Sequence, residues 1–154
     1  MIKIIKIVDG DILQAKEDIR CHQTNSKGVM GGGIAKQIRE KYPEVYKLYK
    51  ELCDKHNPRD LLGVVQYVEC HDGYTIANLF GQEDFGRNKQ YTDYDALRNA
   101  LNIIYKRVKQ YNESIAIPVN LGCGLAGGNW EVVYKIIEEV FHDYDVTLYR
   151  WEVK

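Results

Sequence analysis

The stretch Asn25–Tyr42, NSKGVMGGGIAKQIREKY, decides how the rest of this 154-residue chain is expected to fold. It follows a β-rich segment, Ile19–Thr24, and its three consecutive glycines, Gly31–Gly33, lead directly into a helical pattern. Glycine has no Cβ, so this backbone can adopt positive φ and lie close against a ligand. From Ile34 onward the apolar side chains fall at positions 34, 35, 38 and 42, which is one face of a helix. The pattern predicts a strand, a glycine turn and a helix N-terminus.

The first turn of such a helix is suited to an anion. Its N–H groups have no acceptor within the helix, and the positive end of the helix dipole points the same way. Counting Gly28, this turn holds four glycines, and each costs conformational entropy that a purely structural turn does not need. We therefore expect a phosphorylated ligand here. The alternative is a helix that simply begins after a flexible turn.

The composition is that of a globular protein, and we expect one domain spanning residues 1–154. Hydrophobic residues make up 45% of the chain, charged residues make up 28%, and the formal net charge is −1. This charge argues against a general nucleic-acid binder, although it does not exclude a small anionic ligand. No apolar run approaches the length of a membrane span and no signal-peptide pattern is evident, so we expect a cytoplasmic protein without a membrane partner.

The four cysteines do not form a metal-binding framework. Cys53 and His56 lie on an expected helix, whereas Cys70 and His71 close an expected strand, where adjacent side chains point to opposite faces. No second pair has the spacing of zinc ligands. We expect reduced thiols, no metal and no cofactor.

Hydrophobic periodicity and turn signals predict the order of the elements. Strands are expected over Ile2–Val8, Ile19–Thr24, Gly63–Cys70, Tyr74–Phe80, Ser114–Val119 and Asp145–Trp151. Helices are expected from Ile34 to Tyr42, from Pro43 to about His56, after an N-cap at Thr92 to Tyr111, and from Trp130 to His142. The Asp72-Gly73 turn indicates an antiparallel hairpin. The result is a three-layer α/β/α domain with a six-stranded mixed sheet, in which the polar loop Gly81–Gln90 is a candidate for function or mobility.

A second glycine turn lies in NLGCGLAGGNW, residues 120–130. Gly122, Gly124 and Gly127 match the dinucleotide-binding spacing, but only 27 residues follow Gly127, too few for the rest of a dinucleotide-binding fold. The turn is better interpreted as another backbone cradle for phosphate that ends at another helix N-terminus. Because ligands of open α/β sheets bind at the carboxyl ends of the strands, both turns are expected to face one crevice. Two facing cradles suit a diphosphate with a sugar at each end, as in ADP-ribose.

These motifs resemble those of a known family. The segments GVMGGGIAKQI (28–38) and NLGCGLAGGNWE (120–131) resemble the two ligand loops of macrodomains, and Asp11-Ile12 resembles their adenine-binding corner. The similarity is greatest to the compact branch that includes yeast-type ADP-ribose 1''-phosphate phosphatases and terminal ADP-ribose glycohydrolases. It implies that ADP-ribose lies across the crest of the sheet.

The resemblance also implies roles for individual residues. Asp11 should accept a hydrogen bond from the adenine amino group, Ile12 should contribute backbone contacts, and Asn25 should approach the distal ribose, the one farther from adenine. The alternatives are that Asp11 caps a turn and that Asn25 closes one. The residues expected around the diphosphate and distal ribose are Gly31, Gly32, Gly33, Ile34, Gly122, Cys123, Gly124, Leu125, Ala126 and Gly127.

The resemblance assigns catalysis to His22, at the end of the second expected strand. An imidazole beside a phosphate can attack it or move its proton; the alternative is a buried histidine satisfied by its neighbours. The glycohydrolase branch carries an Asp where this chain has Ala126, and a Lys after the strand that here ends at Phe80, where Lys89 comes several residues late. The covalent Lys–Asp mechanism is therefore expected to be absent.

Other groups are weaker candidates for chemistry. Glu83 or Asp84 could act as a general base from the long loop, and Cys123 is more easily explained as a small residue in a tight turn than as a nucleophile. Two classes of function remain. One is a hydrolase acting on ADP-ribose 1''-phosphate or on an ADP-ribosyl carboxylate ester, which the presence of His22 favours. The other is a non-catalytic ADP-ribose-binding module, which the missing Asp and Lys favour. The physiological substrate and the oligomeric state do not follow from the sequence.

Overall fold

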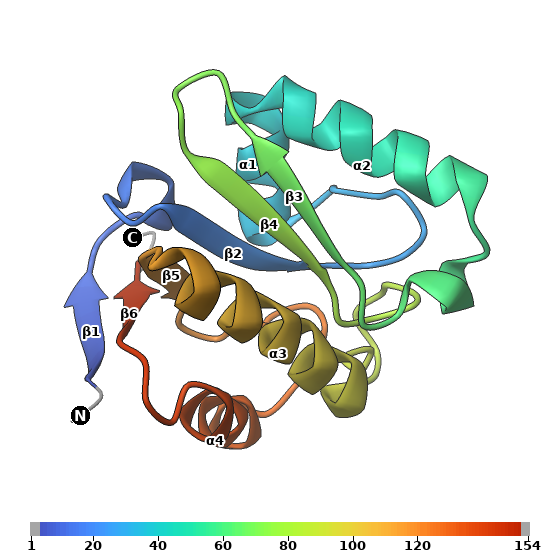
Figure 1. Ribbon diagram of the computed structural model, residues 1–154. Coiled ribbons are helices and arrows are strands. Elements are labelled where there is room, and N and C mark those ends of the chain that lie inside the picture. The colour runs from blue at the N-terminus through green and yellow to red at the C-terminus, as the bar shows by residue number, and fades with distance from the viewer. Residues whose placement is uncertain (1–3, 152–154) are drawn as a thin grey trace.

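The computed structural model describes residues 4–151, and its centre is a six-stranded sheet with the order β1-β6-β5-β2-β4-β3 (Figure 1). Every neighbouring pair of strands is parallel except β3 and β4, which form the expected antiparallel hairpin. The strands are β1 (Ile5–Asp9), β2 (Ile19–Thr24), β3 (Val65–Glu69), β4 (Thr75–Phe80), β5 (Ile115–Pro118) and β6 (Val146–Arg150). The predicted mixed sheet is confirmed.

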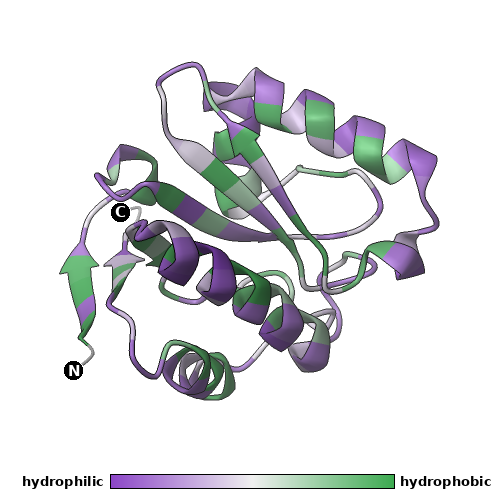
Figure 2. Cartoon of the chain, in the orientation of Figure 1, coloured by the Kyte–Doolittle hydropathy of each residue, from purple (hydrophilic) through white to green (hydrophobic). Residues whose placement is uncertain are grey.

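Helices cover both faces of this sheet. One face carries α1 (Gly33–Lys41) and α2 (Pro43–Lys55), and the other carries α3 (Tyr94–Tyr111) and α4 (Trp130–Val140) (Figure 1). Two short 3₁₀ helices, η1 (Ile12–Gln14) and η2 (Pro58–Leu61), lie in the connections. Hydrophobic and hydrophilic residues occupy different sides of the helices (Figure 2), so each apolar stripe packs on the sheet. The three-layer α/β/α prediction is confirmed.

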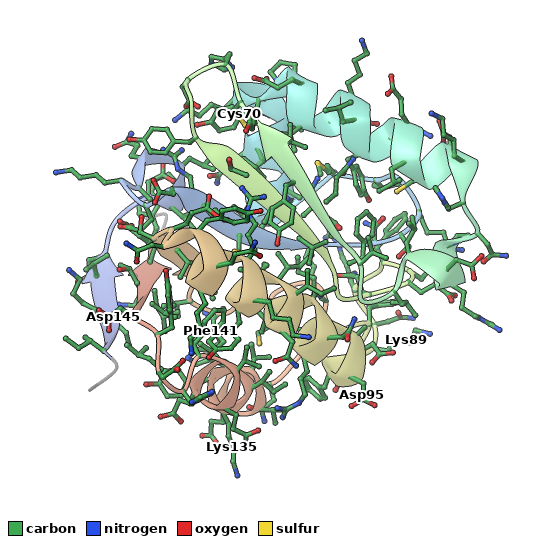
Figure 3. The ribbon with its side chains drawn as sticks, in the orientation of Figure 1. Cys70, Lys89, Asp95, Lys135, Phe141 and Asp145 are labelled. Atoms are coloured by element: carbon green, nitrogen blue, oxygen red, sulfur yellow. The ribbon has the colours of Figure 1, made fainter. Side chains whose placement is uncertain are left out.

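A separate hydrophobic core lies on each face of the sheet. On the α3 and α4 side, the fully buried Phe141 packs edge-on against Tyr105 of α3, whereas Lys135 points outward from α4 into solvent (Figure 3). On the α1 and α2 side, Tyr42 and Tyr49 are fully buried. Since β2, β4 and β5 are covered by both cores, the centre of the sheet is a rigid base for the loops at its carboxyl end.

A buried arginine fixes the connection that follows β1. The Arg20 guanidinium donates hydrogen bonds to the carbonyl oxygens of Leu13 (2.6 Å) and Ala15 (2.8 Å) and to the Tyr42 hydroxyl (2.8 Å). Backbone carbonyls at the end of a short helix have no N–H partner within the helix. Here Arg20 satisfies both of them, and the Lys41 ammonium also donates to the Leu13 carbonyl oxygen at 2.7 Å. The η1 segment is therefore held against β2 and α1.

The structure corrects one predicted boundary in detail. Thr92 is not the N-cap of α3; that position belongs to Asp93, whose side chain accepts a hydrogen bond from the Ala96 N–H at 3.0 Å. The Thr92 hydroxyl instead donates to the Gly122 carbonyl oxygen at 2.6 Å. Of the strand predicted over Ile2–Val8, residues 2 and 3 lie outside the described part of the chain, and β1 runs from Ile5 to Asp9. Within residues 4–151, none of the helices combines the length and the apolar character that a membrane crossing requires.

Candidate functional site

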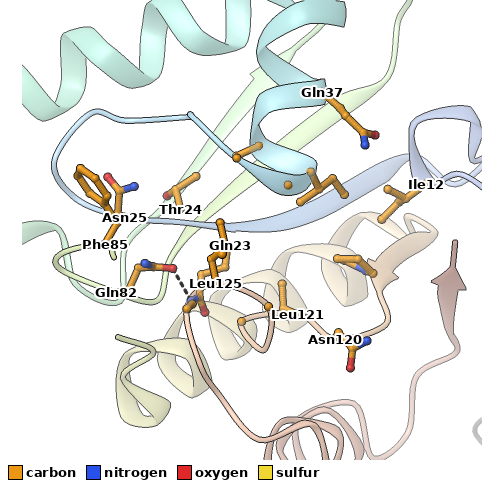
Figure 4. Close-up of a pocket in the computed structure, with 18 of the residues that line it drawn as sticks. Ile12, Gln23, Thr24, Asn25, Gln37, Gln82, Phe85, Asn120, Leu121 and Leu125 are labelled. Carbon is orange, nitrogen blue, oxygen red and sulfur yellow. Dashed lines mark hydrogen bonds between the residues drawn. The ribbon is translucent and has the colours of Figure 1, made fainter. Parts of the chain in front are cut away.

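A cleft of about 630 Å³ lies across the carboxyl ends of the parallel strands (Figure 4). The segments that line it follow β1, β2, β4, β5 and β6, and the first turn of α1 completes its wall. Eleven of the thirteen predicted ligand-binding residues line it: Asp11, Ile12, Asn25, Gly31, Gly32, Gly33, Ile34, Gly122, Gly124, Leu125 and Ala126. The two exceptions are Cys123 and Gly127. Segments more than 80 residues apart in the sequence thus share one cleft.

The N-terminus of α1 opens on the cleft without a side-chain cap. Gly32 is the N-cap residue and provides no side-chain hydrogen bond to the N–H groups of the first turn. Gly33 has φ +56°, a conformation that glycine adopts without steric cost. The first-turn N–H groups, together with the helix dipole, are therefore left for an anion or for water.

The two glycine turns meet across the cleft. A Cβ built on Gly32 would lie 3.0 Å from Cδ1 of Leu125, which belongs to the second turn. Leu125 is half exposed, and its contact with the first turn bridges the two walls. Both turns lie at the same end of the sheet, as the sequence predicts.

Gln23, at the end of β2, is hydrogen-bonded to the 81–92 segment and packs closely against Gly122 of the second turn. Its Nε2 donates to Oε1 of Gln82 at 2.8 Å (Figure 4) and to the Thr92 hydroxyl at 2.9 Å. A Cβ on Gly122, where φ is +71°, would lie 2.8 Å from Gln23 Oε1. Sequence reasoning missed Gln23 and the role of Thr92. The only signal is a polar residue at the end of a strand, which does not identify partners 59 and 69 residues away.

Cys123 and Gly127 hold the second turn together behind the cleft wall. The Cys123 thiol donates to the Leu121 carbonyl oxygen at 3.3 Å, and burial raises its pKa to about 11, so it is a thiol at neutral pH and not a nucleophile. A Cβ on Gly127 would lie 2.6 Å from the carbonyl oxygen of Lys89. These two residues are placed to support the turn, and neither lines the cleft.

The second turn leads to the N-terminus of α4, as the sequence predicts, but this N-terminus is capped and does not face the cleft. The Asn129 side chain accepts a hydrogen bond from the Glu131 N–H at 2.9 Å and so caps α4. Neither Asn129 nor Trp130 lines the cleft, and Trp130 packs on Tyr134 with ring centroids 5.9 Å apart. From this unit, only residues 118–122 and 124–126 line the cleft.

Asp11, Ile12, Tyr149 and Trp151 form the end of the cleft near β1 and β6. Oδ1 of Asp11 accepts a hydrogen bond from the Leu13 N–H at 2.9 Å, so the carboxylate does cap η1, while Asp11 also lines the cleft. Tyr149, whose hydroxyl donates to Glu17, and the half-exposed Trp151 supply aromatic surface there. This end combines one acceptor side chain with flat apolar surface, which suits a purine with an exocyclic amino group.

The Asn25 side chain forms hydrogen bonds that hold the first turn. Its Oδ1 accepts hydrogen bonds from the Lys27 N–H (3.0 Å) and the Tyr49 hydroxyl (2.8 Å), and its Nδ2 donates to the Val29 carbonyl oxygen (2.8 Å). The alternative in which Asn25 closes a turn is therefore realised in the structure. Asn25 still borders the cleft, but a ligand would have to compete with these bonds to engage its amide.

His22 lies outside the cleft. The side chain is fully buried, its Nε2 donates to Oδ1 of Asn78 at 2.5 Å, and Nδ1 has no hydrogen-bond partner among the described residues. Burial lowers the pKa of His22 to about 4, so the imidazole is neutral at pH 7. Asn78 in turn donates to Gln66 (3.0 Å), which donates to the carbonyl oxygen of Leu48 on α2 (3.1 Å).

This placement does not bring His22 to the cleft, and its assignment as the catalytic residue stays a prediction. An imidazole enclosed between the sheet and α2 does not touch a ligand in the cleft, and it matches the alternative of a buried histidine satisfied by a neighbour. Gln23 and Thr24, at the carboxyl end of β2, line the cleft, whereas His22 lies deeper along the strand. The sequence gives the position of His22 in β2 but not the depth of that position below the cleft.

The long loop after β4 is the third wall of the cleft. Gln82, Phe85, Gly86 and Arg87 line it, whereas Glu83 and Asp84, the bases suggested by the sequence, do not. Among the described residues that line the cleft, Asp11 and Arg87 are the only charged ones. Within residues 4–151, no group of three or more His, Cys, Asp or Glu side chains has the arrangement of a metal site.

Comparisons with known proteins agree with this geometry. The model of the Macro domain family matches residues 21–137. An ADP-ribose 1''-phosphate phosphatase from Scheffersomyces stipitis is 32% identical to this chain, over 93% of the chain and 96% of that relative. A DNA ADP-ribosyl glycohydrolase from Mycobacterium tuberculosis is 28% identical over 91% of this chain, but the match spans only 40% of that relative. Among solved structures, DarTG from Thermosipho africanus, in complex with ADP-ribose, superposes with a TM-score of 0.78 at 22% identity, over 97% of this chain and 43% of that one.

Proposed function

This chain belongs to the macrodomain family, and we propose that its cleft binds ADP-ribose derivatives and hydrolyses a group attached to the distal ribose. One observation carries the proposal: two glycine turns, distant in sequence, converge on one cleft beside an uncapped helix N-terminus. A diphosphate needs several N–H donors within a short distance, and glycine backbones supply them without side chains in the way. The names of the relatives, a phosphatase and a glycohydrolase of ADP-ribosyl groups, support the same class of ligand.

The order of the strands suggests how the nucleotide lies. Asp11 and Trp151, beyond β1 and β6, would take the adenosine end. The first turn of α1 and the 120–126 segment would surround the diphosphate, which places the distal ribose toward Gln82 and Phe85 beyond β4. Figure 4 shows Ile12 and Phe85 at opposite ends of the cleft, consistent with an extended ligand between them.

Hydrolysis in this cleft would use an ordered water without a covalent intermediate. The described lining residues include no histidine, cysteine or lysine, and its only carboxylate, Asp11, is at the adenosine end. The attacking water would therefore be held by a neutral acceptor, for which Asn120 is available, whereas the Gln82 amide already bonds Gln23 and Asp84. Backbone N–H groups of the two turns would stabilise the charge that develops on phosphate or ribose oxygens.

A non-catalytic binding module is the second candidate, and a specific observation favours it. The three side chains named as acid–base candidates, His22, Glu83 and Asp84, all lie outside the lining of the cleft. General acid–base catalysis contributes a factor of about 10² to 10⁴ in rate. A macrodomain that lacks such a group at the distal ribose would bind ADP-ribose and turn it over slowly or not at all.

Titration calorimetry and a phosphate-release assay separate these candidates. We expect ADP-ribose to bind with a micromolar Kd, about −8 kcal/mol. Wild type and His22→Ala, both checked for folding, are then incubated with ADP-ribose 1''-phosphate and with glutamate-linked ADP-ribose. Equal turnover by both proteins means hydrolysis without His22, and no turnover by either identifies a binding module. Absence of both binding heat and a thermal shift with ADP-ribose would overturn the proposal.

A further inference from the structure

The cleft has opposite charges at its two ends. Asp11 follows β1, and Arg87 lies in the loop after β4; no other charged residue of the described chain lines the cleft. In the order β1-β6-β5-β2-β4, these strands are four steps apart, and neighbouring strands are about 4.8 Å apart, so the charges are separated by on the order of 19 Å. An ADP-ribose whose adenosine lies at the Asp11 end would therefore present its distal ribose toward Arg87.

Arg87 is the cation of this loop that the protein itself does not use. Its side chain is exposed, and it takes part in none of the hydrogen bonds or ion pairs found among residues 4–151. Two nearby cations are engaged: Arg59 pairs with Glu83 at 3.6 Å, and the Lys89 ammonium lies 5.1 Å from the centre of the Tyr91 ring. A guanidinium in a cleft without an anionic partner is suited to an anion brought by the ligand.

The loop that carries Arg87 is tied to the rest of the cleft at both ends. On one side the Ser26 hydroxyl donates to the Gln82 carbonyl oxygen at 3.0 Å. On the other, the Tyr91 N–H donates to the Ala126 carbonyl oxygen at 2.7 Å, which joins the loop to the second glycine turn. Gly86, next to Arg87, lies so close to the Tyr91 hydroxyl that an added Cβ would approach it to 2.0 Å. Arg87 is thus anchored beside the residues that would hold the diphosphate.

We propose that Arg87 is a specificity-determining residue that makes the distal end of the cleft selective for a phosphomonoester on the distal ribose. The inference rests on the function proposed above and names its substrate class. A phosphomonoester is a dianion whose oxygens match the planar donors of a guanidinium in two parallel hydrogen bonds. A carboxylate ester at the same position is neutral, so it cannot form an ion pair with Arg87. The distal end of the cleft therefore distinguishes a phosphomonoester from a carboxylate ester.

The test compares two nucleotides that differ only at the distal end. The probes are ADP-ribose and its non-hydrolysable 1''-phosphonate analogue, and calorimetry measures the Kd of each. We expect wild type to prefer the phosphonate at least tenfold. Arg87→Gln should reduce that preference to about twofold or less, because it weakens binding of the phosphonate more than binding of ADP-ribose. Arg87→Lys, which keeps the charge but not the planar fork, should retain part of the preference.

Lys89→Gln is the matched control, because Lys89 is in the same loop but does not line the cleft. It should leave both Kd values unchanged, and all variants should keep the wild-type melting temperature. Equal weakening of both nucleotides by Arg87→Gln would place the guanidinium on the diphosphate and overturn the inference, as would no effect on either. If wild type binds neither nucleotide, the proposed function fails and this inference fails with it, whereas binding of ADP-ribose with no phosphonate preference overturns only the inference.

Discussion

The segments β2–α1 and β5–α4 follow one plan, a strand, a glycine turn and a helix, but their glycines meet different constraints. In the first unit an added Cβ would find space on Gly31, where the nearest atom is 3.6 Å away, and on Gly33, where nothing lies within 4 Å. On Gly28 and Gly32 its closest contacts would be with the ends of the Lys50 and Leu125 side chains, at 3.1 and 3.0 Å. In the second unit a Cβ on Gly127 or Gly128 would meet a backbone carbonyl oxygen at 2.6 or 2.5 Å. Glycines of the first turn leave room for a ligand, whereas these two glycines let the chain pack against itself.

The N-termini of α1 and α4 also differ in whether a side chain caps them. Among residues 4–151, no side chain caps the N-terminus of α1, where the N-cap residue is Gly32, whereas the Asn129 side chain caps α4. A cap satisfies N–H groups that an anion would otherwise take. One strand–turn–helix unit is thus open to a ligand and the other is closed, although both have the same glycine-rich appearance in sequence.

The strands that precede the turns differ in chemistry. β5, Ile115–Pro118, is apolar, whereas β2 carries the buried polar residues Arg20, His22 and Thr24. Buried polar groups stabilise a fold only while their partners remain matched. The first unit is therefore open at its turn and polar beneath it, and the second is packed at its turn and apolar beneath it.

The largest expected effect is the substitution Gly128→Ala. The new Cβ would lie 2.5 Å from the Gly122 carbonyl oxygen, which is backbone and cannot move without shifting the turn, so we expect a loss of about 3 kcal/mol or more in the free energy of unfolding. Urea denaturation measures it. Gly124→Ala is the control, since nothing lies within 4 Å of its Cβ position, and it should change stability by less than about 0.5 kcal/mol. Equal losses from both substitutions would remove the distinction between packed and open glycines.

The next effect concerns the buried polar strand and depends on pH. His22 has a folded-state pKa of about 4 against 6.5 when exposed, because burial disfavours the imidazolium. The unfolded chain therefore binds more protons than the folded one between these values. The stability that His22 contributes is present above pH 6.5 and is lost as pH falls toward 4, by about 3 kcal/mol in all.

Urea denaturation of wild type and His22→Gln from pH 7.5 to 4 tests this. The variant has no imidazole at position 22, so its stability should fall less steeply between pH 6.5 and 4, although Asn78 loses its partner and the variant is less stable at neutral pH. Carboxylates titrate similarly in both proteins, so the difference between the two curves isolates His22. Parallel curves would show that His22 is not the buried, neutral group described here.

How far the sequence predicts this molecule differs between backbone and side chains. Periodicity placed β2 at Ile19–Thr24 and identified the antiparallel hairpin, because both are local patterns of apolar residues and turn residues. The meeting of the two glycine turns also followed, since parallel strands deliver their loops to one edge. The sequence did not predict how far each side chain lies from the cleft: His22 and Gln23 are neighbours, but His22 is enclosed and Gln23 lines the cleft.

Hydrogen bonds between residues distant in the sequence could not be predicted either. Thr92 has the residue type of an N-cap, yet its hydroxyl bonds Gly122, and Asp93 caps α3 instead. Both residue types accept the N-cap role, and the choice between them depends on a partner 30 residues away. Whether each helix N-terminus is capped could not be predicted either, because Asn129 caps α4 through a local hydrogen bond that its residue type allows but does not require.

A smaller effect is expected from removing the cap of the closed unit. Asn129→Ala leaves the N–H groups of the first turn of α4 without their side-chain acceptor and should cost about 1 kcal/mol of unfolding free energy. The affinity for ADP-ribose should remain within twofold, since Asn129 does not line the cleft. Calorimetry and urea denaturation measure the two quantities. A clear loss of affinity without loss of stability would mean that α4 contributes to ligand binding after all.

The smallest effect on stability, and the most informative for the open unit, is expected from Gly32→Ser. Gly32 has φ −150° and ψ 164°, which any residue adopts, and the Leu125 side chain that a Cβ would touch can move aside. The serine hydroxyl can cap α1, so stability should change by only a few tenths of a kcal/mol or rise slightly. The same hydroxyl occupies N–H groups that the ligand needs, and affinity for ADP-ribose should fall about tenfold, or about 1.4 kcal/mol. Gly32→Ala adds the same Cβ without the hydroxyl, so it measures the steric part alone. If serine and alanine weaken binding equally, the cleft loses affinity through bulk, and the uncapped N-terminus of α1 is not the group that holds the anion.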